Sequence, residues 1–482
     1  MAIRAFPLGI GLLAALCLAA CDGAESGPIV VSAIGGAPER INPNLKRVDA
    51  ATAILLESTA QGLVRFNAEG QIEPALAQSW IVSDDGLRYT FRLARGAKWA
   101  NGQDVTAEQV VARLKATMSR ASSNALKPLL GVIDDIESMT DDVLEISLKA
   151  PRAHFLQLLA QPDMAILQSE KGTGPFQAEA TENGAVLLAP IPEEEGEETR
   201  EPTRSVLLRG EEAAKAVARF EAGGADLVTG GTIASLPYAR SARLPANTLR
   251  FDPAHGLLGL AFTRLEGRWA DAGAREALSM ALDRGAIATA LQVPELRARP
   301  TLLPAGLEEV RQPALPLWAS QPLDGRRARA SQALANGEAD PPIIRVAVPD
   351  TPGHRFLFAL IRRDWRAIGV DAVAVESGAT SDLAFIDEVS PITGASWYLR
   401  RFSCEIQPVC DPEIDALLAD ARQTRSIAER MRFFAEADRR LTDASYYIPI
   451  GSPVRWSLVS GRLSGFRTNV FAQHPLGELI AE

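Results

Sequence analysis

The chain has few of the residues and motifs on which most enzyme classes depend. Of its 482 residues, four are histidine and four are cysteine. It contains no GxSxG elbow, no HExxH, no Walker loop and no GxGxxG after a predicted strand. A hydrolase would also need a nucleophile and a base, and the sequence offers no pair for these roles. These absences predict a protein that is not an enzyme.

The histidines are too scattered to predict a metal site. They are His154, His255, His354 and His474, and none of them forms a close pair or a ligand-spaced cluster. We therefore expect neither a metal held directly by the protein nor another cofactor.

Composition and charge set broad limits on the fold and the partners. The chain is 47% apolar and carries a net charge of −10 at pH 7. An acidic balance argues against a nucleic-acid partner. The length exceeds the size at which a single core stops growing, so two lobes are expected. The acidic run at 193–198 is interpreted as a solvated loop.

Only the N-terminus has a long apolar run. The run from Phe6 to Ala20 is shorter than the roughly 20 residues that a spanning helix needs, and it fits the apolar region of a signal peptide. It ends in LAAC, which resembles a bacterial lipobox. Residues 1–20 would then be removed, and Cys21 would carry the lipid. The alternative is an ordinary secretory signal followed by a chance cysteine. Asp22 resembles an inner-membrane retention signal, which favours the inner over the outer membrane.

Cys404 and Cys410 enclose the short loop CEIQPVC. Two nearby cysteines in an oxidising compartment predict a disulfide. The alternative is a metal or redox pair, but the spacing is not CxxC and no histidine is close. A loop this short gains about 2–3 kcal/mol at most from closure.

The most informative segment runs from Ile72 to Val110. Within it, Ser83 to Gly86 reads SDDG, which is turn chemistry. Leu87 to Leu93 alternates apolar and polar residues, which predicts a strand with one buried face. A capping box that starts at Thr106 predicts a helix from Ala107.

This segment resembles the signature of family 5 of the bacterial extracellular solute-binding proteins, the peptide- and nickel-binding receptors of ABC importers. Gly172 to Phe176 resembles the family's GTGPY turn, and Phe220 to Gly230 resembles its approach to the hinge. A helix over 274–282, followed by Asp283 and Arg284, resembles a family helix that ends in an Asp-Arg pair. The resemblance implies an α/β fold, namely a two-lobed periplasmic binding protein (type II-like, cluster C) with its ligand cleft between the lobes.

The resemblance also implies a division of the chain into domains. Residues 21–258 are expected to form lobe I, with an inserted subdomain at about 65–170. Residues 259–444 form lobe II, and residues 445–482 return to complete lobe I.

Lobe II contains one readable βαβ unit. The strands are expected at 343–348 and 370–375 and the helix at 356–368, with Phe356, Leu360 and Ile368 on its apolar side. Such a crossover should join parallel strands.

The ligand site departs from the family pattern. In the family's peptide binders an acidic residue just after a strand of lobe II holds the free amine, in a Trp, Asp, Asp-Pro pattern. Here Ala384 to Pro391 lacks both the Trp and the Asp-Pro pair. Asp387 and Glu388 are the candidates for this role, and Asp387→Ala would then abolish amine-dependent binding. The alternative for both is an exposed loop carboxylate.

Four further residues are candidates for ligand contact. Trp397 and Tyr398 offer stacking surfaces, and Arg400 and Arg401 could fork a carboxylate. The alternative is a Trp packed in the core and two surface arginines.

Taken together, these features predict a monomeric, lipid-anchored periplasmic receptor. It would capture a small solute, an oligopeptide or dipeptide, for an inner-membrane ABC permease and its ATPase. The alternatives are a receptor of the same fold for a metal chelate, an opine or a sugar, and a lipoprotein that binds a protein partner without transport.

Overall fold

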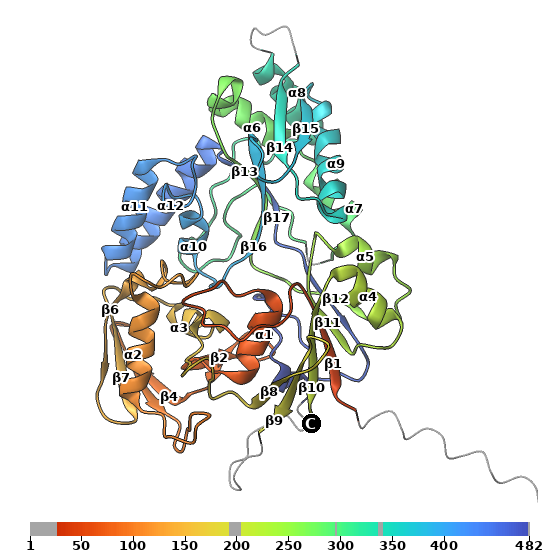
Figure 1. The fold of residues 1–482 in the computed structure, drawn as a ribbon. Helices are drawn as coiled ribbons and strands as arrows, with labels where there is room; N and C mark the ends of the chain where they lie inside the picture. The colour runs from red at the N-terminus through yellow and green to blue at the C-terminus, as the bar shows by residue number, and fades with distance from the viewer. Residues whose placement is uncertain (1–26, 192–203, 295, 336–340, 481–482) are drawn as a thin grey trace, which may run out of the picture.

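The computed structural model describes residues 27–191, 204–294, 296–335 and 341–480. Figure 1 shows an upper lobe above two lower parts that lie side by side. The predicted signal peptide, Cys21, Asp22 and the acidic run at 193–198 lie outside the described residues.

The lower right part in Figure 1 is built on a seven-stranded mixed sheet. Its order is β12-β18-β11-β1-β10-β9-β8. The strands are β1 Ile29–Ile34, β8 Phe176–Ala180, β9 Val186–Pro190, β10 Val206–Glu211, β11 Leu227–Thr232, β12 Leu249–Phe251 and β18 Arg455–Val459. The central strand β1 is parallel to both of its neighbours.

The upper lobe is built on a five-stranded sheet of order β15-β14-β16-β13-β17. Its strands are β13 Gly256–Phe262, β14 Ile343–Ala347, β15 Asp371–Val375, β16 Leu383–Val389 and β17 Tyr447–Gly451. Every residue of β13 is buried, as expected of a central strand covered on both faces.

The lower left part holds the remaining strands. A four-stranded antiparallel sheet has the order β4-β5-β7-β6, and β2 pairs with β3 beside it. These strands are β2 Val64–Phe66, β3 Ile72–Pro74, β4 Ala77–Val82, β5 Arg88–Leu93, β6 Ile133–Ser138 and β7 Val143–Leu148.

Helices cover all three parts. In the lower parts they are α1 Ala50–Thr59, α2 Ala107–Met118, α3 Phe155–Leu159, α4 Ala213–Glu221, α5 Leu236–Ser241 and α13 Leu476–Ile480. In the upper lobe they are α6 Ala272–Ala281, α7 Arg284–Leu291, α8 Leu323–Leu334, α9 Pro352–Arg366, α10 Ala395–Arg400, α11 Pro412–Gln423 and α12 Ile427–Ala444.

Local predictions in the signature segment are confirmed. The SDDG turn closes with Gly86 N–H donating to Ser83 O at 2.8 Å, and Gly86 has a φ of +67°. Tyr89, Phe91 and Leu93 of β5 are buried on one face. Helix α2 begins at Ala107 behind a complete capping box.

Two predictions about lobe II helices are wrong, one about where a helix ends and one about which face of a helix is buried. Asp283 and Arg284 do not end α6, because Asp283 caps the next helix, α7, by accepting from Ala286 N–H at 2.9 Å. In α9, Phe356 is exposed, and the buried stripe lies one position later, at Leu357 and Ile361. Ile368 is buried as predicted, but it lies beyond the end of α9. The predicted parallel pairing of the flanking strands β14 and β15 is confirmed.

The chain changes between the seven- and five-stranded sheets at points that differ from the predicted division. One change falls at 252–255, between β12 and β13, and the other at 452–454, between β17 and β18. Residues 447–451 pair with β13, so they belong with the upper sheet rather than with a return segment starting at 445. The lobe limits themselves stay a prediction.

Candidate functional site

Two short, adjacent segments join the sheets of the upper and lower lobes. They are 252–255 and 452–454, and they are the only links between these sheets within the described ranges. Asp252 is held on the lower side. Its Oδ1 accepts from Asn469 N–H at 3.0 Å, and its Oδ2 lies 3.3 Å from His474 Nε2. Two neighbouring crossings of this kind form a hinge, because few backbone angles need to change for one lobe to rotate.

A glycine keeps the two hinge segments close together. Gly256 has a φ of +150°, and a Cβ added there would lie 2.0 Å from Glu388 O and 2.8 Å from Pro453 Cγ. Any side chain at this position would push the second segment and β16 away. The hinge therefore depends on the close approach that only glycine permits.

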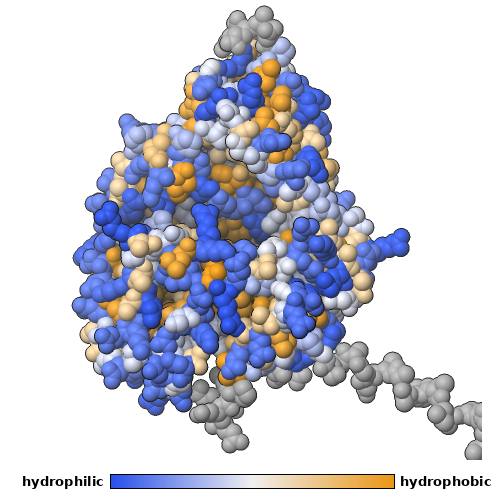
Figure 2. All heavy atoms as spheres, in the orientation of Figure 1, coloured by the Kyte–Doolittle hydropathy of each residue, from blue (hydrophilic) through white to orange (hydrophobic). Residues whose placement is uncertain are grey.

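The lobes also touch on both sides of the hinge. Gln161 Nε2 donates to Pro391 O at 2.7 Å, and Gln157 accepts from Thr393 N–H at 2.8 Å. On the other side, Gly353 N–H donates to the carbonyl oxygen of Ala234, just before α5, at 3.1 Å. Figure 2 shows the surface hollowed where the upper lobe meets the two lower parts. This junction is the place where a solute would be enclosed.

Asp387 lies in the junction, within β16 rather than in a loop. Its side chain is 11% exposed, and Oδ1 accepts from Arg455 Nη1 at 2.7 Å. Arg455 lies on β18, so this ion pair links the two sheets. The exposed-loop alternative is wrong for Asp387, and its role toward a ligand stays a prediction.

The other predicted charged residues are also paired. Arg401 forms a bidentate pair with Glu388, with bonds of 2.7 and 2.6 Å. Arg400 donates to Glu405 at 2.6 Å. The two neighbouring arginines thus bind different carboxylates and do not form one anion-binding fork.

The two predicted aromatic residues differ in exposure. Both belong to α10, and their rings meet edge to face with centroids 5.0 Å apart. Tyr398 is fully buried. Trp397 is partly buried and packs against both the lower-left core and the core around α10–α12. Of the pair, only Trp397 presents a surface at the junction.

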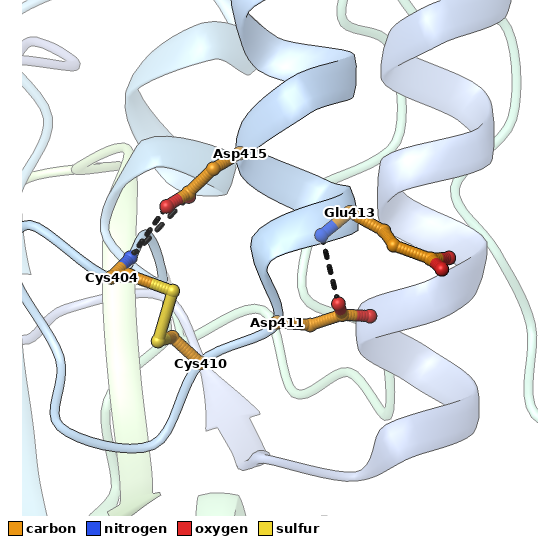
Figure 3. The surroundings of a disulfide bond; sticks show 5 residues. All are labelled: Cys404, Cys410, Asp411, Glu413 and Asp415. Carbon is orange, nitrogen blue, oxygen red and sulfur yellow. Dashed lines mark hydrogen bonds between the residues drawn. A yellow bond between two sulfur atoms is a disulfide. The ribbon is translucent and has the colours of Figure 1, made fainter.

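The predicted disulfide between Cys404 and Cys410 is present, with a Cα–Cα distance of 5.0 Å (Figure 3). The Asp415 carboxylate from α11 accepts the Cys404 N–H at 3.1 and 3.3 Å. Asp411 caps α11 through Glu413 N–H. The bridge fixes the connection between α10, which carries Trp397, and α11.

Sequence reasoning missed several polar residues of the junction. Arg455 was not singled out, because it follows Asp387 by 68 positions and lies in the other sheet. Arg299 is half-buried and donates to Gly256 O at 2.7 Å. Burial lowers the pKa of His255 and His354 and so disfavours their protonated forms. None of these residues belongs to a motif. The one sequence signal that could have drawn attention to this region is the resemblance of Phe220 to Gly230 to the family's approach to the hinge.

A separate groove of about 990 Å³ lies within the lower parts. It is lined by the end of α1, by the GTGPF turn and by α13, and none of its lining residues belongs to the upper lobe. Glu57 lines it, and burial raises the pKa of this carboxyl to about 8. The groove is therefore distinct from the junction at the hinge.

The described ranges contain neither a group of metal ligands nor a membrane-spanning helix. No three His, Cys, Asp or Glu side chains in the described ranges come together as a metal-holding group. Within those ranges, no helix has both the length and the apolar character needed to cross a membrane.

Comparison with known proteins agrees with this geometry. The family of bacterial extracellular solute-binding proteins, family 5 Middle, matches residues 71–383, which is well over half of the chain. The chain belongs to this family. Both the predicted family and the predicted two-lobed fold are thus confirmed.

Three similar proteins show how far the likeness extends. The nickel-binding periplasmic protein of Escherichia coli K12 is 24% identical over 437 residues, covering 80% of this chain and 82% of that protein. The glutathione-binding protein GsiB of Escherichia coli O6:K15:H31 is 33% identical over 187 residues, or 35% of each chain. The OppA structure from Haemophilus influenzae, in complex with RPPGFSPFR, has a TM-score of 0.77 at 18% identity. It covers 95% of this solute-binding protein and 98% of that chain.

Proposed function

We propose that this solute-binding protein captures a small solute of the peptide class between its lobes and delivers it to a membrane importer made of a permease and an ATPase. The observation that carries the proposal is the pair of short links at 252–255 and 452–454 between the two sheets. Lobes joined in this way close by rotation about the links. A solute held at the junction stabilises the closed form because it contacts both lobes at once.

The peptide class is supported by similar proteins rather than by a defined pocket. GsiB is named for glutathione, which is a tripeptide, and the OppA structure holds a peptide. The nickel-binding relative keeps a metal chelate as the second candidate. In the described ranges the junction offers no ready-made metal cluster, so a metal would have to enter with its own chelator.

Native mass spectrometry tests this proposal. The mature protein, purified without its lipid cysteine, is measured before and after mild unfolding and refolding. We expect a released mass that matches a short peptide. A released metal chelate would replace the peptide class, and an empty protein that ignores a peptide pool would argue against solute capture.

We also propose that Cys21 carries a lipid that tethers the receptor to the periplasmic side of the inner membrane. The support is the LAAC sequence and the Asp22 that follows it. Metabolic labelling with a radioactive fatty acid should mark the wild type and leave Cys21→Ser unlabelled. Equal labelling of both would refute the anchor.

Trp397 is the predicted site residue best placed to report a bound solute. It is partly buried at the junction and packs against two cores that belong to different parts of the chain. We propose that it contacts the solute directly. Binding should then change tryptophan fluorescence in the wild type, and Trp397→Phe should lose that change while retaining its fold. An unchanged signal in the variant would remove Trp397 from the site.

A further inference from the structure

Asp387, the first candidate for amine recognition, already has a cationic partner in this chain. Its Oδ1 accepts from Arg455 Nη1 at 2.7 Å, and Arg455 Nη2 donates to the Asp387 carbonyl oxygen at 3.2 Å. The two side chains are 11% and 15% exposed, so solvent screens the pair only weakly. The charge of Asp387 is therefore compensated without any ligand.

Glu388, the second candidate, is also paired with an arginine. Arg401 donates from Nε and Nη2 to the two carboxylate oxygens at 2.7 and 2.6 Å. A forked guanidinium matches a carboxylate in a way that a single ammonium cannot. An incoming amine would have to replace two aligned bonds with one. Neither acidic residue is thus open to an amine.

A third arginine at the junction has no carboxylate partner. Arg299 donates from Nη2 to Gly256 O at 2.7 Å and from Nε to Thr301 O at 3.3 Å. No ion pair to Arg299 is formed by the described residues. Carbonyl oxygens satisfy its hydrogen bonds but leave its charge uncompensated. Arg299 thus differs from Arg455 and Arg401, each of which is paired with a carboxylate.

Two tyrosine hydroxyls lie within reach of the same charges. The pKa of Tyr447 is raised, first by burial, and the charges of Arg299, Asp387 and Glu388 act on it as well. Burial also raises the pKa of Tyr398 to about 12, so both hydroxyls stay protonated. Both side chains are buried in the core of the upper lobe. The guanidinium of Arg299 is thus the group at the junction that suits an anion.

We propose that the lobe junction recognises its solute through an anionic group, a carboxylate, and not through a free amine. The inference rests on the proposed function and narrows it to acidic small solutes, including peptides whose amine is blocked. Arg455 occupies the place that a ligand amine would take against Asp387, and Arg299 supplies the charge that a ligand carboxylate would meet.

Matched tripeptide pools test this with the wild type. One pool has both termini free, one is N-acetylated and one is C-amidated, and each is titrated calorimetrically into the mature protein lacking its lipid cysteine. Acetylation should change Kd by less than about threefold, and amidation should weaken binding at least about tenfold, because it removes a charge-assisted hydrogen bond. A requirement for the free amine, or indifference to amidation, would overturn the inference and leave the proposed function standing. No binding by any pool would refute the peptide class and the inference together.

Two sets of variants test the residues. The double variant Asp387→Asn/Arg455→Met removes the pair without leaving a buried charge alone. It should bind the free-terminus pool within about threefold of the wild type, and lost binding by the folded variant would return the amine role to Asp387. Arg299→Gln should bind at least about tenfold more weakly, with Arg299→Lys as the control that keeps the charge. Wild-type affinity in Arg299→Gln would refute its role, and circular dichroism confirms that each variant is folded.

Discussion

The close approach at Gly256 makes a sharp prediction about the hinge. In Gly256→Ala the new Cβ would lie 2.0 Å from Glu388 O, 2.8 Å from Pro453 Cγ and 2.9 Å from Val389 Cα. A strained backbone at a φ of +150° costs about 1–3 kcal/mol. Forcing packed neighbours apart costs about 1–3 kcal/mol more. We therefore expect a loss of about 2–6 kcal/mol in the free energy of unfolding.

Gly267→Ala is the matched control for this experiment. Gly267 also has a positive φ, +54°, but nothing lies within 4 Å of an added Cβ. It should lose only the backbone cost of about 1–2 kcal/mol. Urea unfolding followed by tryptophan fluorescence measures both variants. The reasoning about the hinge fails if Gly256→Ala is no less stable than Gly267→Ala.

Three further predictions concern the upper lobe. Replacing Cys404 and Cys410 together with serine should cost about 2–3 kcal/mol at most, measured by thermal unfolding, because the closed loop is short. Burial raises the pKa of Asp438 from 3.8 to about 6. The folded state then holds this proton more tightly, so stability is lost as the pH rises from about 4 to 6, and Asp438→Asn should recover up to about 3 kcal/mol at pH 7. Arg284 is buried and donates to three oxygens, so Arg284→Met should cost about 3 kcal/mol in urea unfolding by leaving acceptors unpaired.

Each of these has a clear contrary result. Reduction of the wild type that leaves its melting temperature unchanged would deny the disulfide a stabilising role. Parallel pH profiles for wild type and Asp438→Asn between pH 4 and 7 would show that this carboxyl does not titrate at a raised pKa. A fully stable Arg284→Met would mean that its acceptors find other partners.

Local features of the fold were predictable because their causes are local. The SDDG turn needs only the short-range bonds of Asp85 and a positive φ at Gly86, and both are present. The start of α2 follows from Thr106 and Gln109, three positions apart. Signals of this kind lie within a few residues of the structure that they specify.

The phase of α9 was mispredicted because a charged residue lies on its buried face. Asp364 is fully buried, since it accepts from Asp283 N–H and from Arg327 at 2.9 Å each. Apolar periodicity assigns an aspartate to solvent, which turns the predicted face toward Phe356. The compensating partners come from other helices, and sequence spacing does not reveal them.

The candidate site was harder to predict for the same reason. Asp387 and Glu388 could be located as acidic residues near a strand end, but their state depends on Arg455 and Arg401. Arg455 approaches only because β18 follows β17 through a short hinge link. Strand β17 is apolar throughout, and such a strand fits either sheet equally well.

A distance measurement between the lobes tests whether a bound solute closes them about the hinge. Dyes are attached to Leu45→Cys and Leu317→Cys, which replace side chains 74% and 86% exposed on opposite lobes, in the mature protein without its lipid cysteine. Energy transfer between the dyes is recorded as the free-terminus tripeptide pool is added. Closure should give a saturable change in transfer that follows the binding measured by calorimetry. Transfer that stays constant across the titration would contradict it.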